Sequence, residues 1–225
     1  MLKNDKWIIK QARNGMITPF TESLIREVKV VIPGNLLAEN PTNPNSLLKE
    51  NALEITLASP TRRVISYGVD SYGYDLTLSP GSFKVFRHTP GTVINPKRFN
   101  EEQNLEAVEL KENEDGQYFI LPGHSYGLGF STERIAVPDN ITVLCLGKST
   151  YARVGVIANI TPFEAGWQGY PTLEFSNSSE ADCMIFANEG VVKMMFLEGE
   201  PCMVTYADRG GKYQNQPARI VTSRV

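Results

Sequence analysis

Apolar and polar residues alternate in short segments along most of this chain, a pattern typical of β-strands. From Val64 onward the segments are rich in β-branched and aromatic residues, and Gly, Pro, Asn and Asp separate them at the spacing of an all-β sandwich or barrel. The predicted strands cover residues 63–67, 74–78, 83–87, 107–110, 117–121, 141–146, 156–160, 172–176, 183–187 and 191–197. The pattern therefore predicts a mainly β fold.

Two short helices and one irregular stretch interrupt this pattern. Asp5 is placed to cap a helix that runs to about Asn14, and Gly15 is placed to end it. A second helix is predicted over 148–154, after an apolar strand. Residues 28–63 are rich in Pro and Asn and read as an excursion with one hairpin around LEITL. We expect one domain over 1–225 that includes this excursion.

Composition narrows the class of protein. The chain has 225 residues, 41% hydrophobic and 21% charged, which suits one soluble domain with a sizeable core. A net charge of -3 gives no general attraction to nucleic acid or anionic membranes, so any phosphate site is local. The first 15 residues lack an unbroken apolar run, which argues against a signal peptide or membrane span. We expect a cytoplasmic protein whose three cysteines are reduced core thiols.

The stretch CLGKST, residues 145–150, ends like a phosphate-binding P-loop. A P-loop also needs a glycine five residues before the Gly-Lys pair, because its backbone amides wrap the phosphates. Thr142 occupies that position, so the P-loop is excluded. Lys148, Ser149 and Thr150 at a helix start still suit a phosphate.

Arg153 lies four residues after Ser149, so on a helix both would share one face and could reach a common ligand. The alternative is an ordinary helix cap with an arginine that points into water, since serine and threonine begin many helices. These residues alone leave both interpretations open.

Glu174 is a carboxylate within the apolar strand TLEFS. Alternation would place Leu173 and Phe175 on one face and Glu174 on the other. A carboxylate in mid-strand costs free energy unless it is paired or used. It is therefore either an ion-paired or edge-exposed residue or, with Ser149 and Arg153, part of a site that activates water.

The tail YADRGGKYQNQ, residues 206–216, contains two adjacent glycines, a ring and several donors. Tyr206 could cover a sugar, and Arg209, Lys212 and Gln216 could donate to phosphates. The alternative is a solvated C-terminus.

Taken in order, these stretches closely resemble the dCTP deaminase family, part of the dUTPase-like trimeric superfamily. The matching segments are KNDKWIIK, GMITPF, ISYGVDSYGYDL, FKVF, LGKSTYARVGVIANITP, GWQGYPTLEFSN, ANEGVVKMMF and YADRGGKYQNQ. The resemblance implies a distorted β-barrel or jelly-roll of the dUTPase-like type and a homotrimer with active sites at its subunit interfaces. It also implies hydrolysis of dCTP to dUTP and ammonia, which supplies dUTP for thymidylate synthesis, with Mg²⁺ carried by the triphosphate and dTTP as a possible feedback inhibitor.

The resemblance also implies roles for single residues. Glu174 would be the general acid/base, and Ser149 and Arg153 would hold the attacking water. The substrate-binding residues it implies are Lys148, Ser149, Thr150, Arg153, Glu164, Thr172, Leu173, Lys193, Tyr206, Lys212 and Gln216.

No zinc is expected, although most nucleobase deaminases bind it through H-x-E and P-C-x-x-C motifs. Neither His88 nor His124 is followed by x-Glu, and Pro201-Cys202 lacks a second cysteine. Attack on C4 would then depend on a carboxylate that moves protons, with neighbouring donors to steady the charge.

Three departures from the family pattern leave alternatives open. Lys193 stands where relatives usually have Gln, Thr77 where Arg is frequent, and the loop PFEAGW is shorter than in some branches. Glu164 is the nearest acid that could activate a second water at the α-phosphate. The alternatives are a bifunctional enzyme that releases dUMP, a dUTPase-like pyrophosphatase and a non-catalytic regulatory trimer.

Overall fold

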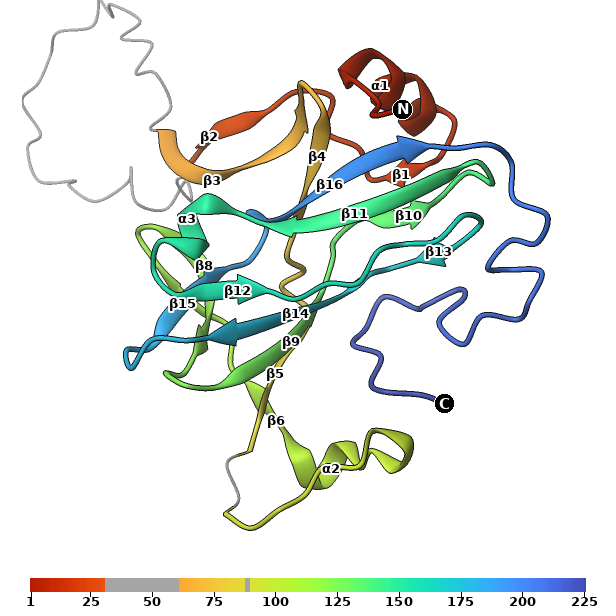
Figure 1. The fold of residues 1–225 in the computed structure, drawn as a ribbon. Coiled ribbons are helices and arrows are strands. Elements are labelled where there is room, and N and C mark those ends of the chain that lie inside the picture. The colour runs from red at the N-terminus through yellow and green to blue at the C-terminus, as the bar shows by residue number, and fades with distance from the viewer. Residues whose placement is uncertain (31–60, 88–89) are drawn as a thin grey trace, which may run out of the picture.

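The computed structural model describes residues 1–30, 61–87 and 90–225. Strands dominate these residues, and the helices are short (Figure 1). The mainly β fold predicted from the alternation is therefore confirmed.

Two five-stranded sheets form the body of the molecule, and neighbouring strands in both are antiparallel. The first, in spatial order, consists of β11 (Ile141–Gly147), β16 (Gly190–Glu198), β4 (Gly73–Thr77), β3 (Thr61–Asp70) and β2 (Ile25–Lys29). The second consists of β12 (Val156–Ala158), β14 (Thr172–Asn177), β9 (Tyr126–Phe130), β5 (Phe83–Phe86) and β6 (Leu105–Val108).

Two three-stranded sheets complete the fold. One consists of β1 (Ile17–Thr18), β10 (Arg134–Ala136) and β13 (Gln168–Gly169), and the other of β15 (Cys183–Phe186), β8 (Gly116–Leu121) and β7 (Lys111–Asn113). The helices are α1 (Asp5–Arg13), α2 (Glu101–Asn104), α3 (Ser149–Ala152) and the 3₁₀ turn η2 (Pro96–Arg98).

The main core lies between the two large sheets (Figure 1). Tyr74 and Phe196 from the first sheet and Leu173 from the second are fully buried in it. The Phe83 ring stacks on Phe119 at 5.2 Å and on Phe175 at 6.1 Å between ring centroids. Because Leu173 and Phe175 fill this core, β14 must turn Glu174 to its other face.

The first helix begins one residue earlier than a cap at Asp5 would require. The side chain of Asn4 caps α1 by accepting a hydrogen bond from the Trp7 amide at 3.2 Å. Asp5 is the first helical residue, and its side chain accepts from the neighbouring Lys6 amide instead. The predicted end is confirmed, since Gly15 follows with φ at +92°.

The strand pattern missed β9 because Gly127 and Gly129 resemble turn residues. In the fold, a Cβ at Gly129 would lie 2.5 Å from Leu78 Cδ1, and one at Gly127 would lie 2.7 Å from the Phe83 ring. Glycine is therefore required by close packing, not by a turn. The pattern also missed β2 and the short strands β1, β7, β10 and β13, and it placed β6 two residues too late.

The ends of the predicted excursion are paired strands. Val28 pairs with Arg62, and Lys29 with Thr61, so β2 and β3 continue into the range 28–63. Residues 31–60, including LEITL and its expected hairpin, lie outside the described residues.

The second helix is shorter than predicted. Lys148 is its N-cap residue and Arg153 its C-cap residue, so α3 is a single turn and not the two turns expected over 148–154. Gly155 follows two residues after this cap, at φ +86°, before the chain enters β12.

All three cysteines are free, and Cys145 and Cys183 pack against the main core as expected, whereas Cys202 does not. Cys202 is exposed after the end of β16, and Cys145 and Cys183 are half-buried. In the described part of the chain, no helix has the length and apolar character needed to cross a membrane.

Candidate active site

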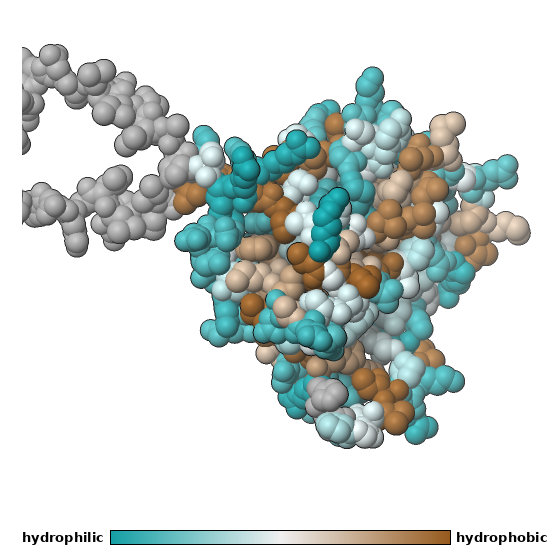
Figure 2. Space-filling view, turned by 60° about the vertical axis from the view of Figure 1, so that its left-hand side comes forward, coloured by the Kyte–Doolittle hydropathy of each residue, from teal (hydrophilic) through white to brown (hydrophobic). Residues whose placement is uncertain are grey.

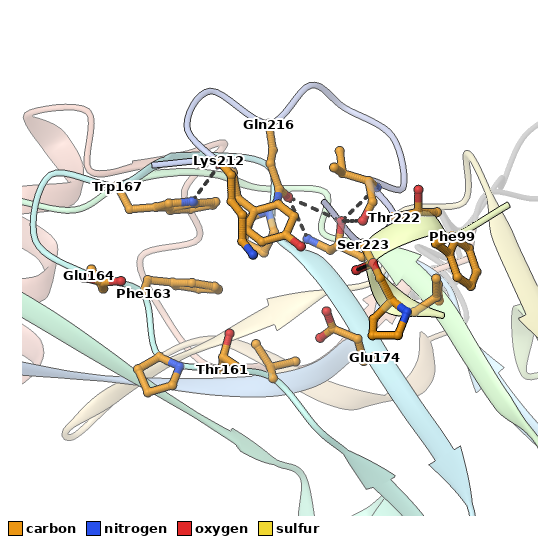
Figure 3. Close-up of a pocket in the computed structure, with 18 of the residues that line it drawn as sticks. Phe99, Thr161, Phe163, Glu164, Trp167, Glu174, Lys212, Gln216, Thr222 and Ser223 are labelled. Carbon is orange, nitrogen blue, oxygen red and sulfur yellow. Dashed lines mark hydrogen bonds between the residues drawn. The ribbon is translucent and has the colours of Figure 1, made fainter. Parts of the chain in front are cut away.

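A cavity of about 590 Å³ opens beside β14. Its walls come from β14, the loop 160–167, Phe86, residues 94–99 and the C-terminal tail. Figure 3 shows Glu174 between Phe163 and Thr161 on one side and Phe99, Thr222 and Ser223 on the other. The volume of this cavity and its mostly apolar walls are typical of a site that binds a small molecule.

Glu174 is the titratable group with the most unusual environment in this cavity. Its Oε2 is buried and has no hydrogen-bond partner among the described residues. Burial raises the pKa of Glu174 to about 8 because the charged form loses water. A carboxyl group with this pKa can hold or release a proton near neutral pH, as a general acid/base must.

The loop before β13 supplies an aromatic wall. The rings of Phe163 and Trp167 stack with centroids 4.7 Å apart. Phe163 exchanges two backbone hydrogen bonds of 2.9 Å with Val143 of β11, which fixes the loop against the first sheet. The wall is therefore preformed on rigid strands.

The C-terminal tail closes the opposite side of the cavity. Trp167 Nε1 donates to the Tyr213 carbonyl at 2.9 Å, and the Thr172 amide donates to Gln216 Oε1 at 3.3 Å. Ser223 Oγ donates to the Pro96 carbonyl at 2.8 Å, which ties the end of the tail to η2. Far from being a frayed terminus, the tail is a wall of the site.

Tyr206, Lys212 and Glu164 lie at the same cavity. Glu164 forms an exposed ion pair with Arg209, so the loop and the tail are also joined by charge. Lys212 supplies a cation that suits a phosphate.

The structure brings together six of the predicted site residues. The residues that line the cavity are Glu164, Thr172, Glu174, Tyr206, Lys212 and Gln216. Leu173 belongs to the same strand, but its side chain is fully buried in the core, so only its backbone can face a ligand.

Five predicted residues lie outside the cavity of the single chain: Lys148, Ser149, Thr150, Arg153 and Lys193. Ser149 and Arg153 are exposed on α3, and Arg153 Nη1 donates to the Ser149 carbonyl at 3.3 Å. Lys148 and Lys193 form ion pairs with aspartates. The predicted meeting of Glu174 with Ser149 and Arg153 therefore stays a prediction.

Sequence reasoning did not single out Phe163, Trp167, Phe99 or Tyr213 as lining residues. Trp167 and Tyr213 do lie in two of the segments that carry the family resemblance, GWQGYPTLEFSN and YADRGGKYQNQ, which was a usable signal for both. No local pattern indicated Phe99.

In residues 1–30, 61–87 and 90–225, no three His, Cys, Asp or Glu side chains are grouped as a metal site requires. Independence from zinc stays a prediction.

A family model described as dCTP deaminase-like matches residues 45–199. This chain belongs to the dCTP deaminase-like family. A dCTP deaminase of Azotobacter vinelandii is 41% identical over 217 residues, covering 96% of this chain and 95% of the relative. A dCTP deaminase of Campylobacter concisus is 48% identical over 156 residues, covering 69% of this chain and 80% of the relative.

This protein shares its fold with a solved structure. The 2'-deoxycytidine 5'-triphosphate deaminase from Agrobacterium tumefaciens superimposes with a TM-score of 0.52 at 13% identity. The match covers 88% of this chain, which spans 48% of that longer chain.

Proposed function

We propose that this protein hydrolyses dCTP to dUTP and ammonia. Water adds its oxygen to C4 of the cytosine, and the exocyclic amino group leaves from the same carbon. Glu174 takes one proton from the water and gives it to ring N3, which keeps it in dUTP. It then moves the remaining proton of the new C4 hydroxyl to the amino group, which leaves as ammonia while the C4 carbonyl forms. The observation that carries this proposal is the carboxyl group of Glu174 in a cavity of nucleotide size, with one buried oxygen that has no hydrogen-bond partner among the residues that the structure describes.

The cavity suits the other parts of this substrate. Phe163 and Trp167 offer rings to the base or sugar, and Lys212 offers a cation to the phosphates. The triphosphate would enter as its Mg²⁺ complex, so the metal belongs to the substrate.

We propose further that a second copy of the chain completes the site within a homotrimer. Ser149 and Arg153 would then face Glu174 of a neighbouring copy and orient the attacking water. Two features support this. Both residues are exposed, at the start and the C-cap of α3. Exposed apolar side chains lie on the neighbouring β11, β12 and the turn between α3 and β12, namely Leu144, Leu146, Ile157 and Val154. Exposed apolar side chains that gather on one surface are typical of a protein interface.

Figure 2 views the molecule from the side that carries α3 in Figure 1, and hydrophobic residues lie among the polar ones on this face. Such a mixed surface suits an assembly whose contacts include charged site residues.

Incubation with each common deoxynucleoside triphosphate and Mg²⁺, followed by chromatography of the products, tests the proposal. We expect dCTP alone to be consumed, with equimolar ammonia and dUTP. Unchanged dCTP would refute the proposed reaction, and binding without turnover would favour the regulatory trimer.

The same assay separates dUTP from dUMP as the product. Glu164 is the second acid at the cavity and the reason to consider release of dUMP, but it is exposed and paired with Arg209. We expect accumulating dUTP and little pyrophosphate. Equimolar dUMP and pyrophosphate from the start would show that Glu164 or another acid activates a second water.

A further inference from the structure

Four charged side chains form a cluster at the end of β3, in the middle of β4, directly after β11 and on β16: Asp70, Asp75, Lys148 and Lys193. Lys193 lies directly opposite Asp75 in the β16–β4 register. Asp70 ends β3, and Lys148 follows the last residue of β11. The cluster holds two positive and two negative charges and is neutral as a whole. We call it the aspartate–lysine cluster.

Lys148 points into the protein, although it belongs to the GKST stretch. Its side chain is 9% exposed and forms an ion pair with Asp75 Oδ2. The same ammonium donates to the Ser66 carbonyl at 2.7 Å and to Ser66 Oγ at 3.1 Å. An ammonium has three N–H donors, and these three acceptors occupy them. Lys148 has no donor left for a phosphate in this arrangement.

Lys193 holds the other side of the cluster. It forms an ion pair with Asp70 and lies 3.4 Å from Asp75 Oδ1. Asp75 is 2% exposed, so its charge depends on the two lysines for compensation. Without Lys193, Asp75 would depend on the Lys148 ammonium alone, and Asp70 would lose its ion-pair partner.

The turn that follows Lys148 needs such support. A single helical turn is unstable by itself, because it fixes several residues for few hydrogen bonds. Lys148 is the N-cap residue of α3, and no side chain caps this end. The anchored side chain of Lys148 therefore fixes where α3 begins, and with it the positions of Ser149 and Arg153.

We propose that Lys148 and Lys193 are positioning residues that act through Asp75 and place α3, and that neither binds the triphosphate. This inference rests on the proposed function, since α3 carries the two residues expected to orient the attacking water. It also departs from the substrate-binding role that the family resemblance implies for both lysines.

Lys193 offers the first test, because its side chain is 33% exposed and its loss leaves the Lys148–Asp75 pair in place. We expect Lys193→Gln to lower kcat for dCTP about 10- to 100-fold, the effect of a small misplacement of reacting groups, with KM nearly unchanged. Lys193→Arg keeps the charge and should restore most of the loss. Lys10→Gln, at an exposed lysine of α1, is the matched control and should resemble the wild type.

A double-mutant cycle tests whether Lys148 acts through Asp75. Lys148→Met combined with Asp75→Asn should be no worse than the more impaired single variant, because both changes remove the same anchor. Multiplied effects together with a raised KM would show that Lys148 contacts the nucleotide, and this result would overturn the proposal.

Hydrogen–deuterium exchange gives a readout that does not depend on activity. Peptides that cover residues 146–155 should exchange faster in Lys193→Gln than in the wild type or in Lys10→Gln. Unchanged exchange would overturn the positioning role even if kcat fell. If the wild type did not deaminate dCTP, the proposed function would fail while this experiment still tested the cluster.

Discussion

The carboxyl group of Glu174 acquires its chemistry from its place on β14. The strand lies between β12 and β9, and its other face fills the core with Leu173 and Phe175. Glu174 therefore cannot move away from the cavity wall, and its burial raises its pKa to about 8. A proton carrier held at one position is the main requirement of general acid–base catalysis.

Glu174→Gln is the most direct test of this residue. Glutamine keeps the shape of the side chain but cannot carry the proton, so kcat for dCTP should fall about 10²- to 10⁴-fold. Steady-state kinetics measure the loss, and calorimetry with dCTP should show that binding survives. Glu109→Gln, at an exposed glutamate, is the control. Near-normal turnover by Glu174→Gln would exclude the proposed role.

Glu133 is a second buried carboxyl group, and it makes stability depend on pH. It is 3% exposed and accepts hydrogen bonds from the Thr77 amide and hydroxyl and from the Tyr74 hydroxyl. Burial raises its pKa from 4.5 to about 7. Between these values the folded chain binds a proton that the unfolded chain has released, so the free energy of unfolding falls as pH rises.

The stabilisation from protonated Glu133 is complete below about pH 4.5 and is lost as pH passes about 7. The loss is on the order of 3 kcal/mol for this group. Urea unfolding measures the free energy of unfolding at each pH. From about pH 5 to about pH 8, this free energy should decline less steeply for Glu133→Gln than for the wild type. Glu174 contributes in the same direction up to about pH 8, so some decline should remain. A slope identical to the wild type would contradict this account.

At the scale of elements, β9 shows how a glycine-rich segment becomes a central strand. It pairs with both β14 and β5, and its glycines let the Leu78 and Phe83 side chains approach the backbone. The glycines of β9 therefore determine how closely the Leu78 and Phe83 side chains pack against the second sheet.

Gly129→Ala tests this packing. The added methyl group would lie 2.5 Å from Leu78 Cδ1, so the core must shift at a cost of about 1–3 kcal/mol. Urea denaturation measures the change. Gly199→Ala is the matched control, because no atom lies within 4 Å of a Cβ there. Equal stability of the two variants would show that the core around β9 has room to spare.

The tail and α3 are elements whose positions depend on the rest of the fold. Residues 213–216 are held along β13 by hydrogen bonds such as Asn215 N to the Gln168 carbonyl at 2.8 Å. The single turn α3 is held by the aspartate–lysine cluster. The tail is too irregular and α3 too short to form alone. The positions of both therefore depend on the sheets against which they are held.

At the scale of the whole molecule, the cavity contains Glu174 but neither Ser149 nor Arg153. A closed ring of identical copies could bring these parts together, since each interface would join α3 of one copy to the cavity of the next. The division of the site within one chain is the reason to expect an obligate oligomer.

Co-expression of two inactive variants tests this division. Ser149→Ala and Glu174→Gln should each be inactive alone, while mixed trimers should regain about a third of the wild-type activity, because one of the three interfaces in each mixed trimer combines the two intact parts. The activity of the purified mixed trimer measures it. Ser149→Ala mixed with Arg153→Ala is the control and should stay inactive, since both changes lie on α3. Mixed trimers without recovered activity would indicate that one chain supplies all three residues.

The amino-acid sequence alone predicts the strand pattern, the N-terminal helix and the side of β14 on which Glu174 lies. These features follow from the spacing of neighbouring residues along the chain. Tertiary structure decided the rest. The raised pKa of Glu174, the close packing of β9 and the docked tail all depend on residues far away in sequence. Lys148 is the clearest case: its local sequence favoured a phosphate, yet its ammonium lies against Asp75, 73 residues earlier. A buried charge is stabilised by the opposite charge that folding brings next to it. For Lys148 that charge lies far away in the sequence, so no short stretch around Lys148 contains it.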